Sequence, residues 1–142
     1  MKSEAYPFAA MEKLSSAIQG DDYSLQWLKD NSYSHLADFS EAINGDEFAF
    51  RNLMKDNHPE LTAIVDALDG KDQAKKWLIT NGFHEYAAMC DAVEENKSAF
   101  MWLAKSGYRD WLLVAKAINK RKQKDERRNP LGFLGSLLPK RR

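Results

Sequence analysis

The sequence predicts an all-α fold, a short α-solenoid of helix-turn-helix repeats with a basic, partly disordered C-terminal tail. Three observations support this prediction. The chain of 142 residues resembles itself at a constant interval, and turn-forming residues interrupt it twice in each interval. Only five valines and threonines occur in total, without the alternation that is typical of strands. Stacked pairs of short helices account for all three observations.

Alanine marks the repeat most clearly. It recurs at a constant spacing, at Ala17, Ala42, Ala67, Ala92 and Ala117. A leucine follows eleven residues after each of the first four alanines, and tryptophan precedes three of these leucines, which gives Leu28, Leu53, Leu78 and Leu103 with Trp27, Trp77 and Trp102. Asn52 stands in the tryptophan column of the remaining unit. Because stacked repeats keep buried positions in register, we predict that these leucines and tryptophans form the structural core of the repeat.

Each interval contains two short helices. Glycine precedes the first helix, at Gly20, Gly45 and Gly70, and pairs of turn-forming residues end it, at 31–32, 56–57, 81–82 and 106–107. A ring residue comes next, at Tyr33, His58, Phe83 and Tyr108, and the second helix follows, with apolar residues three or four apart. Helices of about ten residues are marginally stable alone, so we expect stacking to stabilise them.

The chain begins in the middle of a repeat. Residues 7–18 match the second helix, because Phe8, Met11 and Leu14 fall in the columns of Tyr33, Leu36 and Phe39. We therefore predict a repeat domain over residues 1–119. It consists of a half repeat at 1–16, which caps the stack, and of units that begin at residues 17, 42, 67 and 92.

Charge separates the repeat domain from a C-terminal extension over residues 120–142. Residues 1–119 contain 12 lysines and arginines against 19 aspartates and glutamates, whereas residues 120–142 contain 9 against 2. We expect residues 120–128 to extend the last helix as far as Asn129-Pro130. An apolar motif follows, with Leu131, Phe133, Leu134, Leu137 and Leu138. Three interpretations of this motif stay open: a disordered end, a docking motif, or peripheral contact with a membrane.

The segment Ala42–Asn57 resembles the inter-helix turn and outer helix of an ankyrin repeat, and residues 73–83 are similar to the Lys-Trp-Leu-x-x-x-Gly ending of divergent ankyrin-like arrays. The resemblance covers about residues 17–119. The Thr-Pro-Leu-His motif of typical units is absent, and the period is 25 rather than about 33 residues. Loss of the projecting β-hairpin would give such a shorter unit. The resemblance implies recognition of another protein.

No pattern in the sequence indicates catalysis, a cofactor or a metal. Cys90 is the only cysteine and shares its column with small or apolar residues, so we expect a buried structural thiol. The three histidines, His35, His58 and His84, occupy different columns and lack the spacing of metal ligands. Nucleophile and phosphate-binding motifs are missing. We predict that the protein is not an enzyme and needs no cofactor.

The longest apolar stretch contains only a few residues, and charges interrupt the N-terminal segment. We therefore expect neither a membrane-spanning helix nor a secretory signal, and a cytoplasmic location.

The predicted function is non-catalytic protein–protein interaction, as a module or scaffold with the tail as a docking motif. The candidate contacts are acids at repeated columns, Asp38, Glu41, Asp66 and Asp91, together with the apolar residues of the tail. Lys116 continues the column of the last three acids. The acids predict a partner with a basic surface, and nucleic acid is not the expected partner because the repeats are acidic.

Two alternatives stay open. The first is an accessory factor that the basic tail tethers to a membrane surface or to nucleic acid. The second is a small enzyme or ligand carrier with a pocket between helices near Cys90, His84 or Tyr86.

Overall fold

The structure of the protein is a computed structural model, which describes residues 5–128. This part of the chain contains nine α-helices and no strand, so the prediction of an all-α fold is confirmed. The helices are α1 (Phe8–Ile18), α2 (Asp22–Asp30), α3 (Ser34–Ile43), α4 (Glu47–Lys55), α5 (Pro59–Leu68), α6 (Asp72–Thr80), α7 (His84–Val93), α8 (Lys97–Lys105) and α9 (Arg109–Arg128). No helix within residues 5–128 is both long enough and apolar enough to span a membrane.

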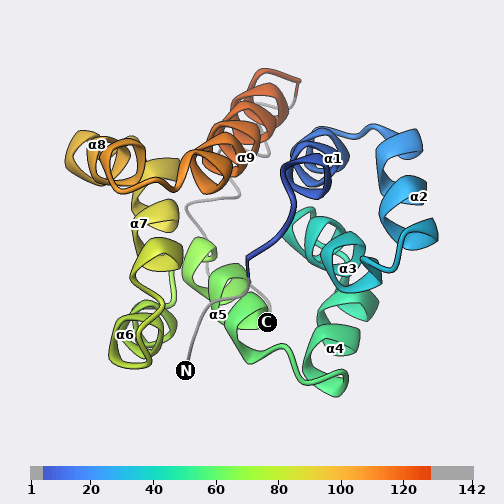
Figure 1. Ribbon diagram of the computed structural model, residues 1–142, viewed down its shortest axis with the longest axis horizontal. Helices are drawn as coiled ribbons and strands as arrows, with labels where there is room; N and C mark the ends of the chain where they lie inside the picture. The colour runs from blue at the N-terminus through green and yellow to red at the C-terminus, as the bar shows by residue number, and fades with distance from the viewer. Residues whose placement is uncertain (1–4, 129–142) are drawn as a thin grey trace.

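The helices form two concentric layers. The odd-numbered helices α1, α3, α5, α7 and α9 lie inside, and α2, α4, α6 and α8 surround them (Figure 1). Each outer helix packs against the inner helix that precedes it and the inner helix that follows it. One repeat unit therefore supplies one outer and one inner helix, as the sequence predicts.

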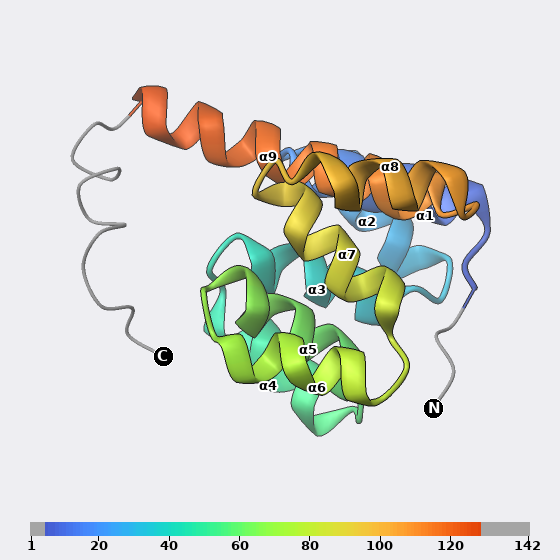
Figure 2. The same ribbon diagram turned by 90° about the vertical axis from the view of Figure 1, so that its left-hand side faces the viewer.

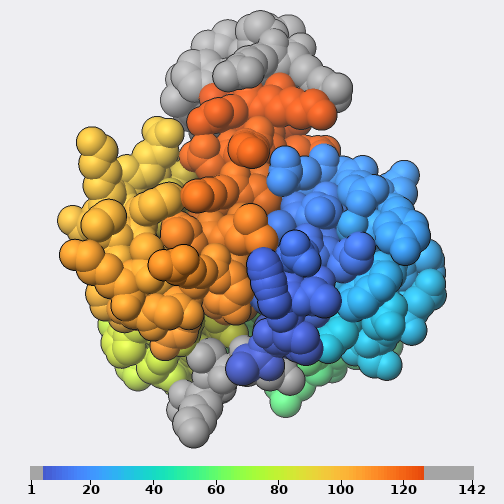
Figure 3. Space-filling view, turned by 45° about the horizontal axis from the view of Figure 1, so that its top comes forward, coloured from blue at the N-terminus to red at the C-terminus, as the bar shows by residue number. Residues whose placement is uncertain are grey.

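The inner layer closes into a ring, which the sequence does not predict, since the repeats indicate only a short stack that its first half repeat caps. Helix α1 packs along α9, and the two lie side by side in Figures 1 and 3. In an open stack, the apolar faces of these two terminal helices would remain in water. Closure instead buries Met11, Leu14 and Ile18 of α1 together with Val114 and Ile118 of α9.

Large side chains fill the centre of the ring. One repeat column points inward from all five inner helices and is buried throughout: Met11, Leu36, Leu61, Tyr86 and Trp111. The Trp111 ring contacts Tyr86 of α7, at 4.7 Å between ring centroids, and Phe39 of α3, at 6.5 Å. Because α3 and α9 are not neighbours in the ring, Trp111 connects two helices that are otherwise separated by α1.

The turns keep the register of the repeat. The backbone is left-handed at Gly20, Gly45, Gly70 and Glu95 between inner and outer helices, and at Ser32, Asn57, Gly82 and Gly107 between outer and inner helices. Both sets of turns lie where the sequence places them. Glu95 is the exception in the glycine column, at φ 64°, in a region that a side chain with a Cβ disfavours.

Helix α9 continues without interruption past residue 119, the predicted end of the repeat domain, to Arg128. Its C-terminal half projects beyond the other helices (Figure 2). The extension of the last helix over residues 120–128 is therefore confirmed. The tail motif, Leu131, Phe133, Leu134, Leu137 and Leu138, lies outside the described residues.

Candidate binding groove

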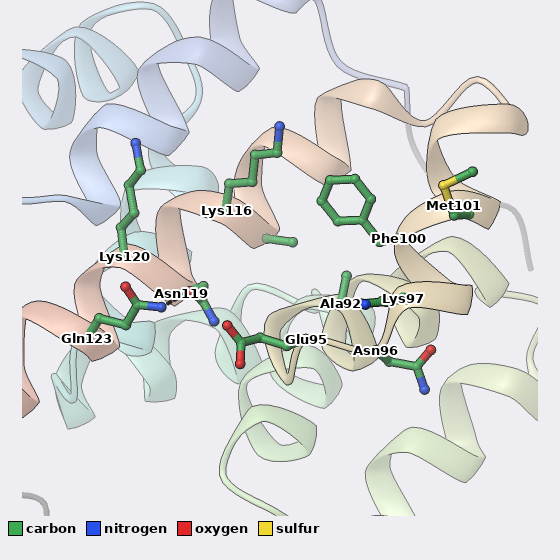
Figure 4. Close-up of a pocket in the computed structure, with 11 residues that line it drawn as sticks. Ala92, Glu95, Asn96, Lys97, Phe100, Met101, Lys116, Asn119, Lys120 and Gln123 are labelled. Atoms are coloured by element: carbon green, nitrogen blue, oxygen red, sulfur yellow. Dashed lines mark hydrogen bonds between the residues drawn. The ribbon is translucent and has the colours of Figure 1, made fainter.

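A groove of about 600 Å³ separates the outer helix α8 from the inner helix α9 (Figure 4). It is lined by Ala92, Glu95, Asn96, Lys97, Phe100, Met101, Ala115, Lys116, Asn119, Lys120 and Gln123. The Asn96 side chain accepts a hydrogen bond from the Ala99 backbone N–H and so fixes the start of α8. Within residues 5–128, α9 packs against a single outer helix, α8, because no outer helix follows α9 in this part of the chain.

Apolar side chains of α8 are exposed in this groove. Phe100 is 36% exposed and Met101 is 49% exposed. The Lys116 ammonium of α9 lies 5.4 Å from the centre of the Phe100 ring, within the range of a cation–π interaction. Figure 4 shows Lys116 and Lys120 extending in the same direction from α9. The lining carries three lysines, Lys97, Lys116 and Lys120, against one acid, Glu95, so the groove combines an apolar floor with a net positive charge and a basic edge on α9.

One end of the groove is fixed by a short chain of hydrogen bonds. The Asn119 side-chain amide donates to the Val93 backbone carbonyl at 2.8 Å, and Gln123 donates to the Asn119 side-chain oxygen at 2.7 Å. The first bond holds α9 against the C-terminus of α7, whose last carbonyls lack partners within the helix. The same contact occurs three units earlier in register, where Asn44 donates to the Ile18 carbonyl at 3.2 Å.

The other three units show what the repeat normally places at the position of Lys116. There the column holds an acid, and each acid lies near a lysine: Glu41 at 3.8 Å from Lys29, Asp66 at 3.4 Å from Lys71, and Asp91 at 2.7 Å from Lys75. In the fourth unit the acid is replaced by Lys116, and the residue that corresponds to Lys75 is Phe100. An ion pair has therefore been replaced by a cation above an exposed ring.

The acids predicted as partner contacts thus have partners within the chain. All are half-buried, and Glu41, Asp66 and Asp91 form the ion pairs given above. Asp38 accepts a hydrogen bond from the Asn52 side chain, and burial raises the pKa of its carboxyl. The structure does not gather these acids into one groove, since they lie on α3, α5 and α7.

The predicted repeat core divides into two classes. The leucines Leu28, Leu53, Leu78 and Leu103 are completely buried. The tryptophans are less buried, and Trp102 is 41% exposed. Each tryptophan stacks on the ring six residues later: Trp27 on Tyr33, Trp77 on Phe83 and Trp102 on Tyr108. Each tryptophan therefore has its stacking partner within its own unit, beside the turn that joins the two helices.

In the unit with Asn52, a different aromatic arrangement occupies this position. His58 stacks on His35 of the preceding inner helix, at 4.7 Å between ring centroids. His35 also lies 3.2 Å from the Tyr6 hydroxyl. His84 is exposed at the start of α7. Within residues 5–128, no three His, Cys, Asp or Glu side chains are arranged to hold a metal ion.

The residues expected around an enzyme or carrier pocket do not come together in the groove. Cys90 and Tyr86 are buried in the core, whereas His84 is exposed. Burial raises the pKa of the Cys90 thiol to about 12. At neutral pH this group is a protonated thiol, in agreement with the structural role predicted from its column.

Sequence reasoning missed the α8–α9 groove as a site, although it noted Lys116. The available signal was a set of three departures from the repeat. Met101 occupies the repeat position that holds Gln26, Arg51 and Lys76 in the other units. Glu95 occupies a position that is glycine in the other three units, and Lys116 a position that is acidic in them. Only the fold shows that these three positions line one groove.

Comparison of the chain with known protein families, with curated proteins and with solved structures found no match. The resemblance to ankyrin-like repeats therefore stays a prediction.

Proposed function

We propose that the protein is a non-catalytic recognition module that binds another protein in the α8–α9 groove. One observation carries this proposal. Where three units place an acid beside a lysine, the fourth places Lys116 above the exposed Phe100 ring. The repeat serves as an internal reference, because three departures from its columns, Glu95, Met101 and Lys116, line one groove.

The exposed side chains of α8 favour binding over a structural role. The other large exposed apolar residues are not consecutive in the sequence and are spread over α1, α2, α4 and α6, which is usual for a protein surface: Phe8, Tyr23, Phe48, Met54 and Ile79. Phe100, Met101 and Trp102 are instead consecutive, and the first two line a groove. Full burial of such a side chain by a partner contributes roughly 1.5–3 kcal/mol. The closed ring would hold this surface on a rigid support.

Affinity capture from a lysate of the protein's own cells tests the proposal. Three baits are compared: the wild-type chain, Met101→Lys, and Ile79→Lys. Met101→Lys restores the basic character that Arg51 and Lys76 give this column, and Ile79, on α6, is 48% exposed against 49% for Met101. The two variants therefore add the same charge at equally exposed sites.

A protein retained by wild-type and Ile79→Lys baits but lost from Met101→Lys is the expected result. If all three baits retain the same proteins, binding does not use the groove and the proposal is wrong. A thermal unfolding curve for each bait verifies that the variants are folded.

A further inference from the structure

The charge and shape of the α8–α9 groove identify the kind of partner, and this inference rests on the proposed function. We infer that the groove binds an acidic amphipathic helix. Apolar side chains of that helix would contact Phe100 and Met101, and its carboxylates would lie beside the lysines of α9.

The basic edge is formed by lysines without ion-pair partners. Among residues 5–126, whose side chains the structure describes, Lys116, Lys120 and Lys124 form no ion pair. Other basic residues of α9 are already neutralised, since Lys122 lies 3.1 Å from Glu94 and Arg121 lies 3.6 Å from Asp125. The three lysines therefore remain available for carboxylates of a partner.

The spacing of these lysines matches the period of a helix. They are four residues apart on α9, which places consecutive lysines about 6 Å apart along the axis. Carboxylates four residues apart on a second helix have the same spacing, so two helices side by side can pair these charges. Lys124 lies beyond the groove in a neighbouring basic hollow with Gln19 and Arg121, which continues the basic edge along α9.

The floor of the groove fits aliphatic side chains. Phe100 and Met101 supply the exposed apolar surface, next to the buried Ala92 and Ala115, and about 600 Å³ accommodates several side chains. Methionine adapts its shape to different partners because its side chain is unbranched and flexible. An amphipathic helix that lays its apolar face in a groove uses this combination of an apolar floor and a charged edge.

Charge disfavours the other occupants. The segment 129–142 of the same chain carries three basic residues and no acid, so the groove lysines would repel it. A nucleic acid would be repelled by the net negative charge of residues 1–119, which contain 19 acidic and 12 basic residues. These occupants, together with a second copy of the chain and a membrane surface, are outcomes of the test.

A displayed library of helical peptides provides the probe. Leucines four residues apart define one face, and the flanking positions vary among Glu, Gln and Lys. We expect selection on the full-length wild-type chain to enrich glutamate at the flanking positions. The affinity of an enriched peptide, measured by fluorescence anisotropy, should then fall as salt is added, because surface charges are screened.

Two groove variants and two matched controls locate the binding site. Lys116→Glu restores the acid of the other units, and Lys76→Glu makes the same charge change on the exposed surface of α6. Met101→Lys is paired with Ile79→Lys as before. We expect each groove variant to weaken peptide binding about tenfold and each control to change it by less than about twofold.

The inference is wrong if the selected peptides carry lysine, or show no preference for a charged residue, at the flanking positions. It is also wrong if Lys76→Glu weakens peptide binding as much as Lys116→Glu does. The inference also fails if the acidic peptide does not bind, while an oligonucleotide, an anionic vesicle or a second copy of the chain binds and loses affinity on the Lys116→Glu change. If the lysate protein is lost from the Met101→Lys bait but the selected peptides are not acidic, the inference of an acidic helix is wrong and the proposed function stands. If capture from lysate does not depend on the groove and no acidic peptide is selected, the proposed function is wrong as well.

Discussion

At the scale of the residue, the environment of Cys90 determines its chemistry. The side chain is 4% exposed and lies 3.9 Å from the Ile64 carbonyl, between two inner helices. Burial removes water that would stabilise a thiolate, and the neighbouring Asp91 carboxylate disfavours a second negative charge. Both effects raise the pKa, to about 12.

We predict that Cys90 of the folded protein reacts at least about a thousandfold more slowly with a thiol reagent at about pH 8 than Cys90 of the unfolded chain. The thiolate is the reactive form, and a pKa near 12 leaves only about one thiol in ten thousand ionised at that pH. The measurement is the rate of modification with and without guanidinium chloride. Rapid labelling of the folded protein would contradict the buried position of this thiol.

At the scale of the element, the turn between α7 and α8 departs from the rest of its column. Glu95 adopts φ 64°, whereas Gly20, Gly45 and Gly70 adopt the left-handed region without a side chain. A left-handed residue with a Cβ costs roughly 1–2 kcal/mol, partly offset by the greater entropy that glycine loses on folding. Since Glu95 lines the α8–α9 groove, the strained residue and the candidate site coincide.

We therefore expect Glu95→Gly to raise the free energy of unfolding by about 0.5–1 kcal/mol. Gly70→Ala is the matched reverse change, because a Cβ at Gly70 meets no atom within 4 Å and adds backbone strain alone. It should lower the free energy of unfolding by about 1 kcal/mol. Chemical denaturation measures both. A destabilising Glu95→Gly would show that the Glu95 side chain makes contacts that outweigh the strain.

The elements were largely predictable from the sequence because each depends on neighbours in its own unit or the adjacent one. The turn columns at Gly45 and Asn57, the buried Leu53 and the extension of α9 all follow from local pattern. The stacking of Trp77 on Phe83 was not predicted, since the repeat shows that a residue recurs but not which ring it meets. The α8–α9 groove was missed because it requires knowing which departures from the repeat lie together in space.

At the scale of the whole molecule, the closure of the ring could not be predicted from the repeat. A period relates each unit to the next, and it contains no information on whether the first and last helices meet. That depends on the small rotation between successive units, which accumulates over the array. In this chain the rotation brings α1 against α9, and Trp111 then joins α7 to α3 through the centre.

Closure changes how the molecule should unfold. In an open array, each unit depends on its neighbours alone, so damage at one end loosens that end first. In the ring, Leu14 of α1 is completely buried in a core shared by all five inner helices. We predict that Leu14→Ala, which should cost about 2–5 kcal/mol, lowers protection throughout the ring.

Native-state amide exchange, followed helix by helix, measures this effect. We expect the free energy of opening of α5 and α6, on the other side of the ring, to fall by nearly as much as that of α1 and α2. Leu78→Ala on α6 is the reciprocal variant, because Leu78 is also completely buried. We expect it to lower the free energy of opening of α1 and α2 in the same way. If Leu14→Ala loosened only α1 and α2 while α5 and α6 kept their protection, the molecule would behave as an open array. The contact between α1 and α9 would then contribute little to its stability, and the α8–α9 groove would lack the rigid support assumed for binding.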